Sequence, residues 1–180
     1  LLPLEGDEKI SSMIKVPDFG GEEIKYLCMV TRKGIIKRTR LSEFKNTRKS
    51  GIIAISIDED EELSFVKMTN GDDNLIVATK KGMAIRFKET DVRAMGRTAR
   101  GVHSMKLNPG QKVVSLVIVN HDAEVITISE KGFGKTNVVE EFRKTKRNSK
   151  GVRAGKFDDK TGALVAMIES KEGTDLLMVA

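Results

Sequence analysis

Glycines at two positions of a repeating unit recur at one interval along the chain of 180 residues. The first series, in which each glycine follows a lysine, consists of Gly34, Gly82 and Gly132. The second series consists of Gly51, Gly101 and Gly151. The intervals are 48 and 50 residues in the first series, and 50 and 50 residues in the second. Because two independent registers agree on one period, the sequence predicts an array of similar units.

Each unit is predicted to form about four short strands and little helix. It opens with a strand of alternating polarity, at 9–16, 62–68 and 112–119. After a polar loop comes a strand rich in β-branched residues, at 24–31, 74–79 and 124–129. The lysine-glycine step that follows is a tight hairpin, because glycine supplies the positive φ that such a turn needs.

The second half of each unit begins with a short return strand. An acidic and apolar stretch, predicted to form a single turn, comes next at 41–44, 89–92 and 139–142. A basic loop then leads to the second glycine, and a closing strand completes the unit at 52–57, 102–107 and 152–157.

Neighbouring units must stack, because a four-stranded sheet cannot bury both of its faces alone. The chain has no tryptophan, which makes WD40 and kelch propellers poor fits. We therefore predict an all-β, propeller-like fold with three complete four-stranded blades plus partial flanking repeats. Within one domain of 1–180, the predicted boundaries are the end of a repeat at 1–9, complete repeats at 10–60, 61–110 and 111–161, and the start of another at 162–180. We expect a fragment of a longer array.

The composition narrows the class of partner. The chain has 32 Lys and Arg residues against 26 Asp and Glu residues, a formal net charge of +6 that fits an anionic partner. Cys28, the single cysteine, lies in an apolar run, so we expect a buried thiol and a reducing compartment. No apolar run approaches the roughly 18 residues of a membrane span, and no signal peptide opens the chain.

Basic residues cluster around the second glycine of every unit. They are Lys45, Arg48, Lys49, Arg93, Arg97, Arg100, Arg143, Lys144, Lys146, Arg147, Lys150 and Arg153. Equivalent positions in stacked units fall on equivalent edges, so we expect these loops to line one continuous rim. Acidic residues gather elsewhere, with five in a row at 58–62, where one unit joins the next.

Loops of this kind suit a phosphate backbone. An arginine-rich loop that ends in glycine lets the main chain approach a phosphate while guanidinium groups donate to its oxygens. No aromatic residue lies in these loops, which argues against stacking on single-stranded bases and favours duplex DNA. Further basic residues on the return strands either extend the track or protect a sheet edge. They are Lys37, Arg38, Arg40, Arg86 and Lys135.

Three segments resemble the C-terminal domain of the DNA gyrase A subunit, and the resemblance covers the whole chain. They read KRTRLSEFKN at 37–46, ATKKGMAIRFKETDVRAMGRTARGV at 78–102 and ISEKGFGKTNVVEEFRKTKRNSKGV at 128–152. The middle segment is the most specific. The related protein of topoisomerase IV has a C-terminal domain of the same architecture with more divergent repeats, and is the nearest rival.

The resemblance implies a β-pinwheel, a propeller variant in which neighbouring blades exchange strands, with duplex DNA wrapped around a positive perimeter. It implies a bacterial parent enzyme in the cytoplasm, associated with the nucleoid. That parent introduces negative supercoils as an A2B2 assembly with its ATPase partner, and uses ATP and Mg²⁺ through other regions. The family's Q-R-R-G-G-K-G box is absent; the matching positions are 47–53, 96–102 and 147–153. The chain therefore resembles the middle-to-late blades.

No active site, cofactor or metal site is predicted in this chain. The family cleaves DNA with a tyrosine in its N-terminal region, whereas Tyr26, the single tyrosine here, lies in an apolar strand and is predicted to be core. His103 and His121 lack the spacing of a nucleophile and its base. Two other functions stay open: a propeller that docks a protein partner through its acidic junctions, and an enzyme with a site in a central channel.

Overall fold

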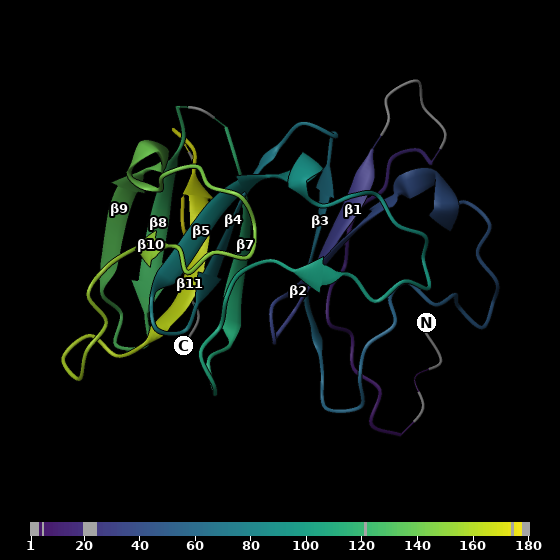
Figure 1. Ribbon diagram of the computed structural model, residues 1–180, viewed down its shortest axis with the longest axis horizontal. Coiled ribbons are helices and arrows are strands. Elements are labelled where there is room, and N and C mark those ends of the chain that lie inside the picture. Colours follow the sequence, from purple (N-terminus) through teal and green to yellow (C-terminus); the bar gives the residue numbers. More distant parts are fainter. Residues whose placement is uncertain (1–3, 5, 20–24, 121, 174, 178–180) are drawn as a thin grey trace.

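The computed structural model describes residues 4, 6–19, 25–120, 122–173 and 175–177. His121 and parts of the predicted flanking fragments lie outside the described residues. The chain forms three antiparallel sheets arranged along the longest axis of the molecule (Figure 1). Within the described residues the only helices are three short 3-10 turns, η1 (Leu41–Phe44), η2 (Glu89–Asp91) and η3 (Val139–Glu141). The prediction of an all-β fold with single turns after the return strands is confirmed.

Each sheet is built on a hairpin whose turn contains a glycine of the first series. The hairpins are β1 (Tyr26–Thr31) with β2 (Ile35–Arg40), β4 (Asn74–Thr79) with β5 (Met83–Lys88), and β8 (Glu124–Ser129) with β9 (Gly134–Val138). The turn glycines have φ of 82°, 76° and 78°. The hydroxyl group just before each turn, from Thr31, Thr79 or Ser129, accepts a hydrogen bond from the backbone N–H four residues later, at 3.0 to 3.2 Å. This bond fixes the turn.

Strands are exchanged between neighbouring sheets. The short strand β6 (Val102–His103), which belongs to the second repeat, pairs with β2 in the first sheet. In the same way β10 (Val152–Arg153), from the third repeat, pairs with β5 in the second sheet. This exchange is the pinwheel feature that the family resemblance implied.

The exchange explains the second glycine series. Gly101 has φ of 108° and runs so close to β2 that a Cβ atom there would lie 2.6 Å from the carbonyl oxygen of Ile36. Gly151 approaches the carbonyl of Ala84 in β5 more closely still. A side chain at either position would therefore push the exchanged strand away from the preceding blade.

The strands that open the predicted repeats, which we call the inner strands, pair with a different hairpin from the one predicted. The strands β3 (Leu63–Thr69), β7 (Val113–Val119) and β11 (Leu164–Ser170) open the predicted repeats that follow, yet each pairs with the hairpin before it: β3 with β1, β7 with β4 and β11 with β8. A periodic sequence looks the same wherever its unit is cut, so the period alone does not show which hairpin a strand joins.

The strand count also departs from three complete four-stranded blades. The sheet orders are β3-β1-β2-β6, β10-β5-β4-β7 and β11-β8-β9, so the third sheet has three described strands. Its missing fourth strand corresponds to the place that β6 and β10 take in the other two sheets. The expected strands at 9–16 and 52–57 are not formed in the described residues.

The core lies between neighbouring sheets and is aliphatic. One cluster joins the first and second sheets and includes Ile36, Leu75, Phe87 and Leu116. A second cluster joins the second and third sheets through residues such as Ile76, which is fully buried. The inner strands β3, β7 and β11 lie side by side along the back of the view in Figure 1, and the exchanged strands β6 and β10 lie at the front. The front is therefore the outer perimeter of the blades.

Candidate nucleic-acid interface

The basic loops of the second and third repeats cross the outer edge of the preceding blade. The N–H of Met95 donates to the carbonyl of Arg38 in β2, and the N–H of Thr145 donates to the carbonyl of Arg86 in β5, both at 2.8 Å. These two contacts are one period apart in donor and in acceptor. As a result the loops run over the front of Figure 1 in the same direction, one beside the other.

Main-chain hydrogen bonds join the second and third basic loops to the closing segment of the repeat before each. Ser56 donates through its N–H to the carbonyl of Ala99 at 3.3 Å, and Lys106 donates in the same way to Ser149 at 2.9 Å. The N–H of Asn148 donates to the carbonyl of Ser104 at 2.6 Å. We call the resulting surface the basic rim and define it as residues 45–51, 93–101 and 143–153.

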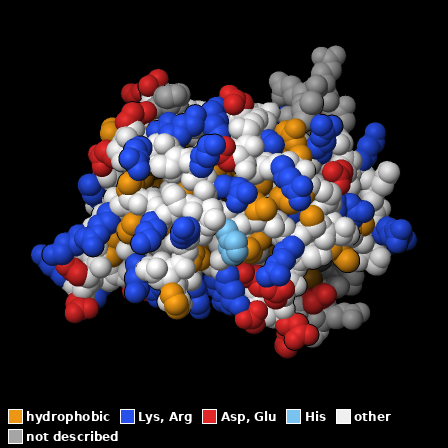
Figure 2. Space-filling view, viewed as in Figure 1, with side chains coloured by type: hydrophobic (Ala, Val, Ile, Leu, Met, Phe, Trp, Pro, Cys, Tyr) orange, Lys and Arg blue, Asp and Glu red, His pale blue; other side chains and the backbone are white. Residues whose placement is uncertain are grey.

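Most of the predicted rim side chains are exposed. The exposed ones are Lys45, Arg48, Lys49, Arg93, Arg100, Arg143, Lys144, Lys146, Lys150 and Arg153. Among these, Arg100 is the one that forms an ion pair with a described carboxylate, that of Asp58. Figure 2 shows Lys and Arg side chains spread along this face from end to end, with Asp and Glu mostly at its margins. The positive charge therefore stays available to a ligand that follows the perimeter.

Arg97 and Arg147 are half-buried and hold the rim together. Arg97 donates through Nη1 to the carbonyl of Ile53 at 3.1 Å, and Arg147 donates through Nη1 to the carbonyl of His103 at 3.2 Å. Arg147 also donates through Nε to the carbonyl of Asp91 at 3.0 Å. The two arginines thus make the same contact one period apart, and part of their donor capacity is used within the protein.

Three of the five candidate cations on the return strands do not reach the surface. Lys37, Arg38 and Arg86 are 0%, 7% and 4% exposed. The Nζ of Lys37 donates to the carbonyls of Ala54 and Arg97, and burial lowers its pKa to about 8 although Glu43 acts in the opposite direction. A buried donor that is already engaged cannot serve a passing phosphate, so the expectation that these three extend the track is corrected.

The other two return-strand cations are exposed. Arg40 ends β2, and Lys135 lies on β9 with its Nζ 4.0 Å from a carboxylate oxygen of Glu141.

Arg38 and Arg86 instead connect neighbouring blades. Arg38 donates through Nε to the carbonyl of Val92 at 2.9 Å and pairs with the buried carboxylate of Glu89, and its guanidinium lies 4.4 Å from the ring centre of Tyr26. Tyr26, which was predicted to lie in the core, is therefore half-buried, with its ring against the Arg38 guanidinium. Arg86 donates through Nη1 to the carbonyl of Val139 at 3.0 Å.

Glu89 is a key residue that the sequence prediction missed. Its carboxylate is fully buried and accepts hydrogen bonds from the hydroxyl of Thr69 at 2.7 Å and the N–H groups of Gly71 and Asp73 at 2.7 and 2.9 Å, besides the Arg38 guanidinium. The signal was present in the repeat, because the equivalent positions hold Leu41 and Val139. A charge at a position that is apolar in the other units marks a specific buried partner.

The acidic run at 58–62 is engaged within the protein. Glu61 accepts from the hydroxyl of Thr31 at 3.0 Å, Glu62 pairs with Arg32 at 2.8 Å, and Asp60 pairs with Lys33. These pairs fasten the junction between repeats to the hairpin of the first blade. Together with the pair that Asp58 forms with Arg100, contacts within the protein account for four of the five acids.

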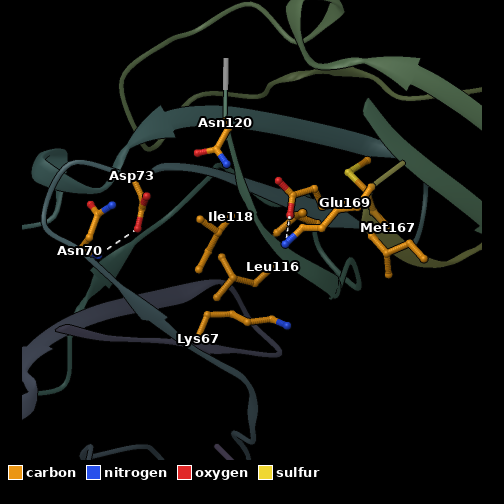
Figure 3. Close-up of a pocket in the computed structure, with 11 residues that line it drawn as sticks. Lys67, Asn70, Asp73, Leu116, Ile118, Asn120, Met167 and Glu169 are labelled. Atoms are coloured by element: carbon orange, nitrogen blue, oxygen red, sulfur yellow. Dashed lines mark hydrogen bonds and ion pairs between the residues drawn. The ribbon is translucent and has the colours of Figure 1, made fainter. Parts of the chain in front are cut away.

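A groove of about 560 Å³ lies along the inner strands, where a channel site would be expected. Figure 3 shows Lys67, Leu116 and Ile118 at its floor, with Asn70 and Asp73 on one side and Glu169 on the other. The Nζ of Lys171 pairs with Glu169 at 3.3 Å. The described residues contain no group of three or more potential metal ligands.

Cys28 lies outside this groove and is buried, as predicted, and burial raises the pKa of its thiol to about 12.

The fold and this surface together define a propeller-like β repeat protein with exchanged strands and a basic perimeter. A family described as "DNA gyrase C-terminal domain, beta-propeller" matches the chain at residues 25–70, 73–120 and 123–171. The chain belongs to this family. Each matched segment covers one hairpin and the inner strand that pairs with it.

Curated relatives extend the likeness in sequence. The DNA gyrase A subunit of Clostridium acetobutylicum is 43% identical over 179 residues, which is 99% of this chain and 21% of the relative. The DNA gyrase A subunit of Haloquadratum walsbyi is 42% identical over 166 residues, which is 90% of this chain and 19% of the relative. The chain thus spans about a fifth of the length of these relatives.

Solved structures share the fold. The C-terminal domain of DNA topoisomerase IV superposes with a TM-score of 0.85 and 28% identity, over 95% of this chain and 53% of that one. The DNA gyrase A C-terminal domain superposes with a TM-score of 0.83 and 29% identity, over 94% and 56%. The predicted resemblance and its rival are both found, and the family match names gyrase. No helix in the described part of the chain is long and apolar enough to cross a membrane.

Proposed function

We propose that the chain binds duplex DNA along the basic rim and bends it around the perimeter of the blades. The observation that carries this proposal is a main-chain hydrogen bond that joins a basic loop to the repeat before it and recurs with the period. Ser56 donates to Ala99, and Lys106 donates to Ser149 one period later. Repetition of one contact keeps successive loops in register along the edge. A ligand that uses all three loops must follow that edge.

Rim chemistry favours a phosphate backbone over bases. The exposed rim cations are lysines and arginines, and the rim segments contain no aromatic side chain on which a base could stack. Smooth bending of 20–30 base pairs costs roughly 1–6 kcal/mol, so several phosphate contacts must offset it. Hydrogen bonds to charged groups contribute about 1.5–3 kcal/mol each, so a few contacts suffice.

The relatives are named as DNA gyrase A subunits, and we propose that in such a parent protein the wrap presents a DNA segment to the cleavage core. We propose that the parent assembles as A2B2 with its ATPase partner, uses ATP and Mg²⁺ through other regions, and acts on the nucleoid in the cytoplasm. A second candidate is the same role in topoisomerase IV, favoured by the TM-score of 0.85 to its C-terminal domain.

Salt titration of duplex binding tests the proposal. If the rim neutralises about six phosphates, the logarithm of the affinity falls with the logarithm of salt concentration at a slope of about −5. A duplex of about 30 base pairs that carries donor and acceptor dyes at its ends should also show increased energy transfer on binding, because its ends approach when it bends. A single strand of equal length should bind more weakly. Salt-insensitive binding, or a preference for the single strand, would contradict duplex recognition by the rim.

A further inference from the structure

Two residues after the second glycine, the three repeats carry different side chains, namely Ile53, His103 and Arg153. All three are exposed. Arg153 is one of the cations of the basic rim, and equivalent positions of stacked units lie on equivalent edges. The repeat therefore places His103 on the same surface as the rim, just beyond the loop 93–101.

The backbone of His103 is held where two basic loops meet. It follows the loop 93–101 and lies on β6, where it pairs with Ile35 of β2. From the loop 143–153, Arg147 donates through Nη1 to the carbonyl of His103 at 3.2 Å. The strand β6 lies at the front of Figure 1, on the outer perimeter of the blades. The exposed imidazole is therefore presented between the two loops, at a place that is fixed from both sides.

The charged side chains closest to His103 along the chain are cations. Arg100 precedes it by three residues and Lys106 follows it by three, and both are exposed. Arg147, from the next repeat, is the third cation at this place. Nearby cations disfavour the charged form of an imidazole. A protonated His103 therefore needs an anion to balance it.

The acidic groups on the side of β2 are already engaged. Ile35, which pairs with His103, lines a small pocket with Asp58, Glu61 and Arg100. There Asp58 pairs with Arg100, and Glu61 accepts a hydrogen bond from a threonine hydroxyl at 3.0 Å. Among the described residues, no carboxylate forms an ion pair with His103. The anion must therefore come from a ligand.

We propose that the protonated imidazole of His103 binds a phosphate of the DNA, so that the affinity of the rim for duplex rises as the pH falls. This role rests on the proposed function, because the phosphate belongs to the duplex that the rim binds. Histidine changes its charge between about pH 8 and pH 5, and a phosphate beside it favours the charged form. Binding of DNA therefore takes up a proton, and by reciprocity a higher proton concentration strengthens the binding of DNA.

The other two repeats supply the substitutions that fix His103 in either state. The third repeat has a permanent charge at this position, Arg153, and the first has none, at Ile53. His103→Ile therefore represents the uncharged form and His103→Arg the permanently charged form. Arg153 lies on β10, which shows that the exchanged strand accepts arginine, and isoleucine favours strands.

Fluorescence anisotropy of duplex binding at about pH 6 and pH 8, at one ionic strength, tests this role. The measured quantity is the affinity at the lower pH divided by the affinity at the higher pH. From the usual strength of an exposed ion pair, this ratio should be about two- to fivefold larger for the wild type than for His103→Ile. His103→Arg should have the ratio of His103→Ile, and at the higher pH it should bind more tightly than the wild type.

The slope of affinity against salt gives a second readout. In the wild type its magnitude should be larger at the lower pH by about 0.9, for one additional phosphate contact. In His103→Ile this increase should be absent. Comparison with His103→Ile also removes other groups that titrate in this range, such as His121 and Lys37, the pKa of which burial lowers to about 8. Circular dichroism at both pH values checks that the variants fold.

Two results would overturn this role in distinguishable ways. If the wild type and His103→Ile have the same affinity ratio, His103 binds no phosphate, while a steep salt dependence in both would still support the basic rim. If the chain binds no duplex at either pH, the proposed function is wrong, and the role of His103 falls with it.

Discussion

The guanidinium of Arg38 lies 3.2 Å from the carboxylate of Glu89, and the two residues come from neighbouring blades. Both are buried, and Glu89 accepts three further hydrogen bonds from Thr69, Gly71 and Asp73. A buried pair of this kind fixes one arrangement of the two blades, because each alternative leaves a charge without a partner.

Replacing Glu89 should therefore destabilise the chain strongly. Glu89→Ala leaves Arg38 as a buried cation without its carboxylate, and breaking such a pair costs about 3–5 kcal/mol. Urea unfolding measures the loss. The control is Glu59→Ala, at an exposed carboxylate in the junction between repeats, where we expect a change within about 0.5 kcal/mol. Equal effects of the two substitutions would contradict the role of Glu89 between the blades.

Two arginines of one basic loop should behave differently. Arg147→Ala removes the hydrogen bonds to the carbonyls of Asp91 and His103, and since each hydrogen bond contributes about 0.5–1.5 kcal/mol, the loss should be about 1–3 kcal/mol. Arg143→Ala removes an exposed side chain and should change the free energy of unfolding by less than about 0.5 kcal/mol. Unfolding curves of the two variants, measured at one salt concentration, decide the matter. If Arg143→Ala destabilises the chain as much, the assignment of Arg147 is wrong.

The second glycine series offers a matched pair of backbone tests. Gly101→Ala would place its Cβ 2.6 Å from the carbonyl oxygen of Ile36, so β6 must move away from β2. Gly51→Ala has the same backbone preference, with φ of 76°, but no neighbouring atom within 4 Å. We expect a loss of about 1 kcal/mol at Gly51 from the left-handed conformation alone and at least twice that at Gly101. Thermal melts of the two variants would show losses of equal size if strand exchange made no contribution.

The buried thiol predicts a specific dependence of stability on pH. Burial raises the pKa of Cys28 from 9.0 to about 12, so above pH 9 the unfolded chain loses a proton that the folded chain keeps. The contribution of the Cys28 thiol to the free energy of unfolding is fully present below pH 9 and falls as the pH rises from 9 towards 12. The slope approaches about 1.4 kcal/mol per pH unit. Comparison with Cys28→Ala isolates the effect, and parallel curves for the two proteins would refute it.

Much of the fold follows from the sequence because backbone requirements recur with the period. A turn glycine after a lysine, a hydroxyl four residues before the return strand and a single turn after it are local features, so Gly34, Gly82 and Gly132 locate the hairpins directly. The partner of an inner strand such as β3 is not local. It depends on which of two adjacent hairpins the strand joins, and both choices have the same period.

The site was predicted at the level of loops but not of single side chains. Arg97 and Arg93 lie in one loop and are one residue type, yet Arg97 is held by the carbonyl of Ile53, 44 residues earlier. Lys37 and Arg86 are basic, as residues of a DNA-binding track would be, but their side chains are buried and donate to carbonyls of the protein. Such differences depend on tertiary neighbours, which the composition of a segment does not contain.

The most direct test of the basic rim compares two sets of four substitutions that remove the same charge. The rim set replaces Arg93, Arg143, Lys146 and Lys150 by alanine, and the control set replaces Lys67, Lys81, Lys112 and Lys160, which are exposed away from the rim. Duplex affinity is measured by fluorescence anisotropy over a range of salt concentrations. The rim set should lower the magnitude of the salt slope by about 3–4, since each lost phosphate contact removes about 0.9, while the control set should leave the slope within about 1. Equal loss in the two sets would show that net charge, and not the rim, attracts the DNA.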